Sequence, residues 1–286
     1  MRKRYTDGTQ SENMGLFDIF KKTEAVKPTE ASKKAEPAPK PEAAVTKPEP
    51  AAAPIVLGDL EKTQTISALL AVPREQRNEE WVNRFLADLP QASFRCGTPQ
   101  LIAGPDGFPY FQLFVPQPGE EYQSYVIEEM ISGFLVERGY GVVLNPGAGH
   151  PDWVLTYGDL LNYQLNGSFF TLDSLFSNSS NAEEEVPEGE EVMVGQPSDL
   201  ILPAHTRKLL KDFFELNGVA NPKVMLMMRK NGENVSQDLA FNITPEGFET
   251  ETHYRNMMQT VTWYLPRHYS VVGIHEDRIN DGFMPL

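Results

Sequence analysis

The chain has 286 residues, 40% of them hydrophobic, and a formal net charge of −15. Ten of its 25 basic and eight of its 40 acidic residues precede residue 55, so residues 55–286 carry a formal charge of −17. This part of the chain is also long enough to form a substantial hydrophobic core. Because so acidic a body repels phosphate backbones and anionic lipid headgroups, we expect neither a nucleic-acid partner nor a broad membrane-binding surface.

Residues 1–20 form a short N-terminal segment that contains the apolar peptide "LFDIF". If this peptide is helical, Leu16, Phe17 and Phe20 share one face, which suits docking to a partner protein or weak attachment at a membrane interface. Residues 14–22 are therefore a candidate partner-binding or peripheral membrane-docking segment.

Residues 21–54 contain no aromatic residue, and Val26 and Val45 are their only branched aliphatic residues. Pro, Ala, Lys and Glu dominate the rest of this stretch. Such a composition buries too little apolar surface to offset the entropy of ordering the chain, so the sequence predicts a disordered linker.

Cys96 is the single cysteine, so an internal disulfide is impossible and the CxxC spacing of redox and zinc motifs is absent. No run of about 18 or more apolar residues could span a bilayer, and the N-terminal region lacks the apolar core of a secretory signal. These features predict a cytoplasmic protein with no transmembrane segment.

Residues 55–180 are predicted to form a first α/β unit. Apolar residues at helical spacing follow the capping residue Asn78, and Gly139 stands where a left-handed helix cap is expected. In chain order, the patterns predict a helix over 79–89, strands at 93–96 and 110–115, a helix over 122–138, a strand at 140–144, and a further strand with a short helix over 152–167.

An acidic run follows, and residues 181–195 are predicted to be a solvated loop. Residues 196–286 then predict a second α/β unit, whose two helices most simply cover one face of its sheet. The methionines of its first strand, Met225, Met227 and Met228, are interpreted as core residues. The expected order is a helix over 202–217, strands at 222–230 and 238–244, a helix over 251–265 and a strand at 269–276.

The fold class is therefore α/β (α+β), with two small α/β units that contain mixed sheets, preceded by the disordered Pro/Ala/Lys/Glu-rich linker.

The segment "RGYGVVLNPGAGHPDW", residues 138–153, has four glycines and two prolines. A phosphate-binding loop would need GxGxxG or Walker spacing followed by a helix, whereas an apolar strand follows here. The sequence therefore predicts a tight connection between two strands.

With these elements in place, the chain resembles the SseB (enhanced serine sensitivity) family over about residues 75–286. The resemblance rests on the order of "LLKDFF", "KVMLMM", "DLAFNI", "YLPRHYSVVGI" and "GFMPL", and on the upstream "GYGVVLNPGAGHPDWVLT". It implies a bacterial cytoplasmic protein with N-terminal and C-terminal SseB-like α/β domains. The family supplies no agreed catalytic residues, and the long linker departs from a plain two-domain pattern.

One alternative is a cysteine-dependent hydrolase or transferase, with Cys96 as nucleophile, His150 as base, and Asp152 or Asp159 to orient the base. The surroundings of Cys96, "FRCGTP", lack known local signatures of cysteine hydrolases. The five histidines show no HxH or HExxH spacing, so we expect no metal site and no cofactor.

The sequence thus favours a non-enzymatic SseB-like protein that acts through protein–protein interaction or regulation, with an unidentified protein partner. Cysteine-dependent catalysis remains the alternative.

Overall fold

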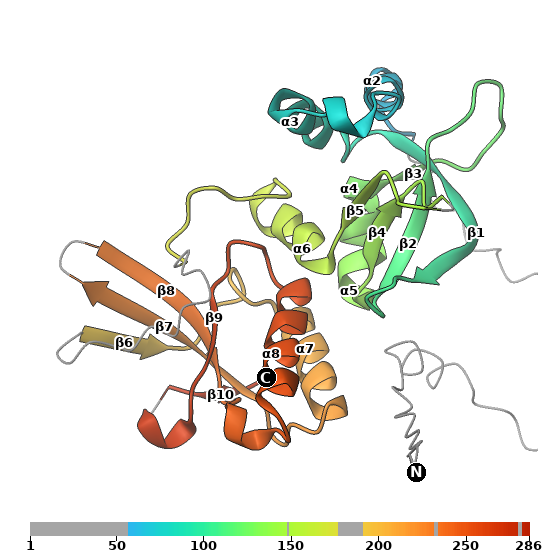
Figure 1. Ribbon diagram of the computed structural model, residues 1–286. Coiled ribbons are helices and arrows are strands. Elements are labelled where there is room, and N and C mark those ends of the chain that lie inside the picture. The colour runs from blue at the N-terminus through green and yellow to red at the C-terminus, as the bar shows by residue number, and fades with distance from the viewer. Residues whose placement is uncertain (1–56, 148, 177–190, 232–233, 280–281) are drawn as a thin grey trace, which may run out of the picture.

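The computed structural model describes residues 57–147, 149–176, 191–231, 234–279 and 282–286. Two mixed β-sheets and their helices make up this part of the chain (Figure 1), which confirms the predicted α+β fold class. The predicted linker, 21–54, lies outside the described residues.

The first sheet has five strands in the order β3-β1-β2-β4-β5. Strands β2 and β4 run parallel, whereas the other neighbouring pairs are antiparallel, so the sheet is mixed. Its strands are β1 (Ser93–Ala103), β2 (Pro109–Phe114), β3 (Tyr125–Val126), β4 (Gly141–Leu144) and β5 (Trp153–Leu155).

A helical crossover joins the parallel strands β2 and β4, as a parallel connection requires. The predicted helix over 122–138 begins later, at residue 127, because residues 125–126 pair with β1 as strand β3. Gly139 ends the crossover in the left-handed conformation, with φ of 74°, as predicted. The crossover consists of α4 (Ile127–Met130), the π-helical η2 (Ile131–Leu135) and α5 (Val136–Arg138).

Three further α-helices and one short 3-10 helix accompany the first sheet. The predicted cap of α3 is confirmed, since the Asn78 side chain accepts a hydrogen bond from the backbone N–H of Trp81. The sequence patterns did not identify α2, in which Ile66 is the one buried residue. The bounds are α2 (Leu60–Leu70), η1 (Arg74–Gln76), α3 (Glu79–Asp88) and α6 (Tyr157–Asn166).

The second sheet has the order β10-β7-β8-β9, and β6 pairs with β7 beside β10. The prediction of an acidic loop over 181–195 is wrong for its last residues, because 191–195 pair with β7 as strand β6. The acidic run stops at Glu191, and the Val-Met-Val that follows it suits a strand. The strands are β6 (Glu191–Gly195), β7 (Lys223–Asn231), β8 (Asn234–Phe241), β9 (Val271–Gly273) and β10 (Met284–Pro285).

Two helices lie together on one side of the second sheet (Figure 1), as predicted. Phe214 of the first helix packs 5.3 Å, centroid to centroid, from Phe241 of β8. Met225 and Met227 are buried, which confirms their core interpretation, and Met228 is half-buried. The helices are α7 (Ala204–Leu216) and α8 (Glu251–Val261), with the short helices η3 (Pro245–Gly247), η4 (Thr262–Tyr264) and η5 (Glu276–Arg278).

The hydrophobic core is continuous between the two sheets. At the junction, Tyr157 of α6 and Thr206 of α7 share a hydrogen bond of 2.8 Å between their side-chain oxygens. Gly158 of α6 lies so close to Leu265 that a Cβ atom would stand 1.9 Å from the Leu265 carbonyl oxygen. This contact requires glycine, and it holds the first half of the chain tightly against the second.

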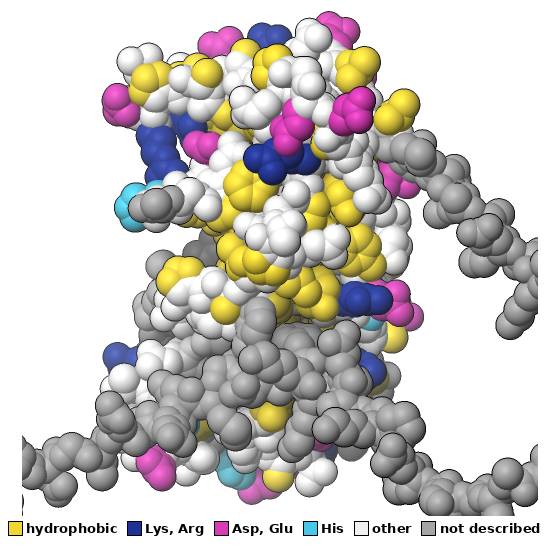
Figure 2. Space-filling model, turned by 90° about the vertical axis from the view of Figure 1, so that its right-hand side faces the viewer, with side chains coloured by type: hydrophobic (Ala, Val, Ile, Leu, Met, Phe, Trp, Pro, Cys, Tyr) yellow, Lys and Arg dark blue, Asp and Glu magenta, His cyan; other side chains and the backbone are white. Residues whose placement is uncertain are grey.

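Hydrophobic side chains gather across the middle of the side on which β1 and β2 lie (Figure 2). Among the residues of these strands, Leu101 and Ile102 are half-buried and pack against the core. We therefore interpret this surface as the outer layer of the core.

Candidate functional site

A pocket of about 450 Å³ lies between the β1–β2 turn of the first sheet and the helices α8 and η4 that accompany the second sheet. One wall comes from the β1–β2 turn and the start of α6, and the other from α8, η4 and the segment after η4. The side chains that line it are Asp106, Phe108, Thr156, Asn256, Gln259, Thr260, Thr262, Trp263 and Arg267.

A chain of hydrogen bonds holds the Asp106 carboxylate in place. Its Oδ2 accepts a bond of 2.6 Å from the Tyr110 hydroxyl, and its Oδ1 accepts one of 3.1 Å from the backbone N–H of Phe108. The Tyr110 oxygen accepts in turn from Trp263 Nε1 at 2.8 Å. Burial, together with the neighbouring carboxylate of Asp106, raises the pKa of Tyr110, so the phenol stays a proton donor to Asp106.

The Arg267 guanidinium is fixed by the carboxylate of Asp159. Its Nε and Nη2 atoms lie 2.6 Å and 2.8 Å from the two Asp159 oxygens, a bidentate pair. Arg267 also lies over the ring of Phe170, 4.6 Å from the centroid. The hydrogen bonds that Arg267 donates to Asp159 raise the pKa of Arg267, and 57% of the Arg267 side chain is exposed.

Asp159 is itself placed by the start of α6. Thr156 caps this helix: its hydroxyl accepts from the backbone N–H of Asp159, and Asp159 Oδ2 accepts from the backbone N–H of Thr156 at 2.9 Å. This reciprocal capping box satisfies both backbone donors.

Stacked aromatic rings form the rigid base of the pocket. Phe108 and Trp263 stack with centroids 3.9 Å apart and planes 2° from parallel, and Tyr264 meets Phe108 edge-on. Phe108 belongs to the first half of the chain and Trp263 to the second. The pocket therefore depends on the packing of the two sheets against each other.

The glycine-rich segment 138–153 contains β4 and leads into β5, and these two strands are antiparallel. The segment therefore joins two strands, as predicted. Asn145 adopts a positive φ of 46°, a conformation that asparagine tolerates better than most residues. Its Oδ1 accepts from the backbone N–H of Val115 at 3.1 Å, and its Nδ2 donates to Asp152 Oδ2 at 2.8 Å. The segment is thus shaped by its own polar contacts.

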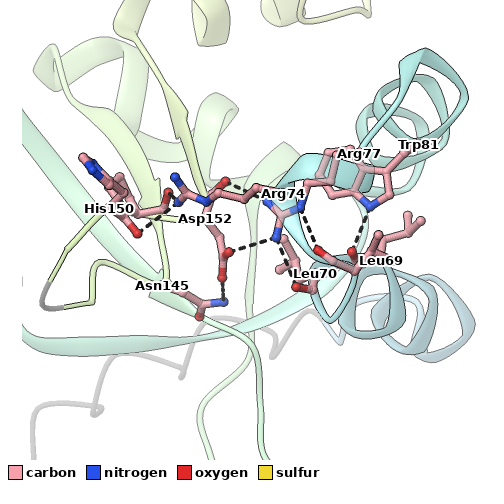
Figure 3. Close-up of polar contacts among 10 residues, drawn as sticks. Leu69, Leu70, Arg74, Arg77, Trp81, Asn145, His150 and Asp152 are labelled. Atoms are coloured by element: carbon pink, nitrogen blue, oxygen red, sulfur yellow. Dashed lines mark hydrogen bonds and ion pairs between the residues drawn. The ribbon is translucent and has the colours of Figure 1, made fainter.

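Two arginines fasten this connection to the N-terminal helices (Figure 3). Arg77 Nη2 lies 3.1 Å from Asp152 Oδ1 and also donates to the Leu70 carbonyl oxygen at 3.1 Å. Arg74 donates to the backbone carbonyl oxygens of His150 and Pro151. Figure 3 shows the side chain of Asp152 turned toward Arg77 and Asn145, and the imidazole of His150 pointing away from it.

The structure does not bring Cys96, His150 and Asp152 together. Cys96 lies on β1, and strands β2 and β4 separate it from β5, which follows Asp152. Three strand spacings of about 4.8 Å give a separation on the order of 14 Å. Burial raises the pKa of the Cys96 thiol, which donates to the Gly97 carbonyl oxygen at 3.4 Å. The further candidate Asp159 is engaged by Arg267.

Within the described ranges, no group of three or more His, Cys, Asp or Glu side chains is arranged to hold a metal ion. Leu16, Phe17 and Phe20 lie outside those ranges. None of the helices described is long and apolar enough to cross a membrane.

Sequence patterns did not identify the pocket residues. Asp159 and Arg267 are 108 positions apart, and Tyr110 and Trp263 are 153 apart, so their pairing leaves no local signal. The one available signal was "TYGD", in which threonine and aspartate stand three positions apart, as in a helix-capping motif.

No protein-family model, curated protein or solved structure matches the chain.

Proposed function

We propose that this protein is a non-enzymatic binding protein that recognises a segment of another protein in the pocket between its two sheets. The proposal carries forward the expectation of a protein partner, which came from the sequence and its SseB-like resemblance. The observation that carries it is the pocket lining, which sets polar side chains beside an aromatic base, includes the hydrogen-bonded side chains of Asp106 and Arg267, and is built from both halves of the chain.

The lining suits peptide groups. Asn256 and Gln259 of α8 offer side-chain amides, each of which both donates and accepts hydrogen bonds. The Thr156 hydroxyl accepts from the backbone N–H of Asp159, and the Thr260 hydroxyl donates to the Asn256 carbonyl oxygen. Each therefore adds a hydroxyl with part of its hydrogen-bonding capacity left. A peptide backbone presents alternating N–H donors and C=O acceptors, so these groups can replace the water that solvates an extended segment.

Two opposite charges frame the pocket. Asp106 supplies a carboxylate and Arg267 a guanidinium, and other side chains hold each of them in position. Because these groups are already ordered, binding loses less side-chain entropy than it would at a flexible surface. They favour a segment that carries complementary charges, which gives specificity and orientation.

The state of the candidate nucleophile supports a non-enzymatic role. A catalytic cysteine needs a lowered pKa and a base within hydrogen-bond reach. Burial instead raises the pKa of Cys96, and Asp152 is engaged by Arg77 and Asn145. These observations favour binding over cysteine-dependent catalysis.

A random peptide library displayed on phage provides the probe, because the natural partner is not identified. Peptides selected on the full-length chain are measured by fluorescence anisotropy against the chain and against Asn256→Ala/Gln259→Ala. Losing two hydrogen bonds of about 1 kcal/mol each weakens binding by about 30-fold. The matched control, Gln117→Ala/Gln196→Ala, removes two exposed amides outside the pocket and should leave affinity unchanged.

The proposal fails if selection yields no binder, or if the selected peptides bind the pocket variant as tightly as the original chain. It also fails in its non-enzymatic part if mass spectrometry shows that bound peptides are cleaved or modified and that Cys96→Ser abolishes this turnover.

A further inference from the structure

Strand β6, Glu191–Gly195, lies at the edge of the second sheet. In the described part of the chain it pairs with β7 alone, so the backbone groups on its other side face away from the sheet. A Cβ atom added to Gly195 would meet nothing within 4 Å, so the space around this end of the strand is open. Such an edge is a template for another strand.

The side chains of β6 are unusual for an exposed edge. Its sequence is Glu-Val-Met-Val-Gly, and Val192 and Met193 are 37% and 56% exposed. Natural edges are commonly protected by lysine, proline or a bulge. β6 contains neither residue, and its pairing with β7 runs without a register shift.

Further exposed apolar side chains lie on the same ribbon. Val235 of β8 is 39% exposed, and Leu175, whose carbonyl oxygen accepts from the backbone N–H of Gln237 in β8, is 55% exposed. Met193 and Val235 occupy the same face, because Met193 pairs with Met228 and Val235 with Lys230, two residues further along β7. Exposed apolar side chains therefore lie both on the β6 edge and on one face of the sheet beside it, where Lys230 stands opposite Val235.

We propose that β6 pairs with β6 of a second copy of this chain, antiparallel and centred on Met193. In this register, Met193 faces the same residue of the second copy, Val192 faces Val194, and Glu191 faces Gly195. The Met193 and Val192–Val194 pairings place apolar side chains together, and the pairing of Glu191 with Gly195 keeps the two glutamates apart. A parallel pairing would set Glu191 beside its counterpart, and like charges directly opposite each other destabilise a sheet.

The backbone supports the same register. A residue-centred antiparallel pair of five-residue strands forms about four to six hydrogen bonds between the copies, depending on which residues of β6 point outward. The two five-stranded sheets would then join into one continuous sheet across a two-fold axis. A strand that is its own complement favours a second copy over an unrelated partner.

Net charge opposes this association. Each chain carries −15, and the resulting repulsion acts over the Debye length, which shrinks from about 30 Å at 0.01 M salt to about 8 Å at 0.15 M. Dimerisation through an apolar edge should therefore strengthen as salt is added. Contacts that depend on ion pairs would weaken instead.

The test uses a charge exchange at the two-fold axis, measured on the full-length chain by sedimentation velocity and native mass spectrometry. Met193→Lys and Met193→Glu each set like charges opposite each other, so each variant alone should dimerise at least tenfold more weakly than the original chain. An equimolar mixture of the two should restore dimers, and these should have the mixed mass. Leu216→Lys, a matched change of a 54% exposed apolar residue at the end of α7, should leave dimerisation unchanged.

The proposal would be overturned if the original chain is monomeric at all protein and salt concentrations. This holds also if the reason is that another segment of the chain occupies the β6 edge. So would a mixture of the two charged variants that forms no mixed dimers although circular dichroism shows that both are folded. Weaker dimerisation at high salt would likewise contradict an apolar strand pair.

Discussion

Replacing Gly158 with alanine should loosen the packing between the two halves of the chain. An alanine Cβ would lie 1.9 Å from the carbonyl oxygen of Leu265 and 2.4 Å from its carbonyl carbon. A carbon and an oxygen in ordinary contact are about 3.3 Å or more apart, so α6 and the segment at residue 265 must separate by more than 1 Å. The two Leu265 atoms that the Cβ would meet belong to the backbone, so they cannot rotate away as a flexible side chain could.

The expected loss of stability follows from two opposing effects. Overpacking a buried contact costs about 1–3 kcal/mol, and the rigid backbone places this case at the upper end. Alanine is favoured over glycine in a helix by up to about 1 kcal/mol. The net loss is therefore about 2 kcal/mol, and since 1 kcal/mol shifts Tm by about 2–4 °C in a domain of this size, Tm should fall by about 4–8 °C.

Differential scanning calorimetry of the full-length chain measures this change. Gly133→Ala is the matched control, because Gly133 also lies in a helical segment but has nothing within 4 Å of the added Cβ. This variant should keep or slightly raise Tm. An unchanged Tm for Gly158→Ala would refute the inferred close approach of α6 to Leu265, and an equal loss in both variants would show that the clash is not the cause.

Two further predictions concern titratable groups. Burial raises the pKa of Cys96, and only the thiolate reacts with a disulfide reagent. At about pH 8, Cys96 should therefore react more slowly in the folded chain than in the chain unfolded with urea. Faster reaction in the folded state would indicate an activated cysteine. Burial lowers the pKa of His268, so the unfolded state binds the extra proton first, and the free energy of unfolding should fall as pH drops from its ordinary value near 6.5 toward the lower folded value. His268→Phe keeps an aromatic ring beside Phe176 and Tyr269 and should reduce this loss of stability at low pH. Urea denaturation at several pH values measures the free energy of unfolding of both chains. An identical pH dependence in the two would contradict the assignment to His268.

The elements that could be predicted from the sequence are those whose signal is local. Helices α3, α7 and α8 carry an apolar stripe at helical spacing, and Asn78 and Gly139 mark helix ends through their own chemistry. Helix α2 has no such stripe, since Ile66 is its one buried residue. Strand β6 follows an acidic run, and its pairing with β7 makes it a strand.

The pocket could not be predicted, because its geometry depends on long-range contacts. Arg267 stands in the quoted string "YLPRHYSVVGI", but nothing nearby indicates that Asp159 holds its guanidinium. The indole N–H of Trp263 donates to the Tyr110 hydroxyl, 153 positions away in the sequence, and no local pattern indicates this bond. By contrast, the segment 138–153 was correctly predicted as a turn, since the absence of a following helix after its glycines is a local feature.

Hydrogen–deuterium exchange of the full-length chain, with and without a selected peptide, tests the binding site most directly. If the pocket between the sheets holds the peptide, protection should appear in the β1–β2 turn around Asp106, at the start of α6, and in the second half of α8 with η4, and it should be lost in Asn256→Ala/Gln259→Ala. Protection confined to other parts of the chain, or retained in that variant, would contradict the assignment of this pocket as the binding site.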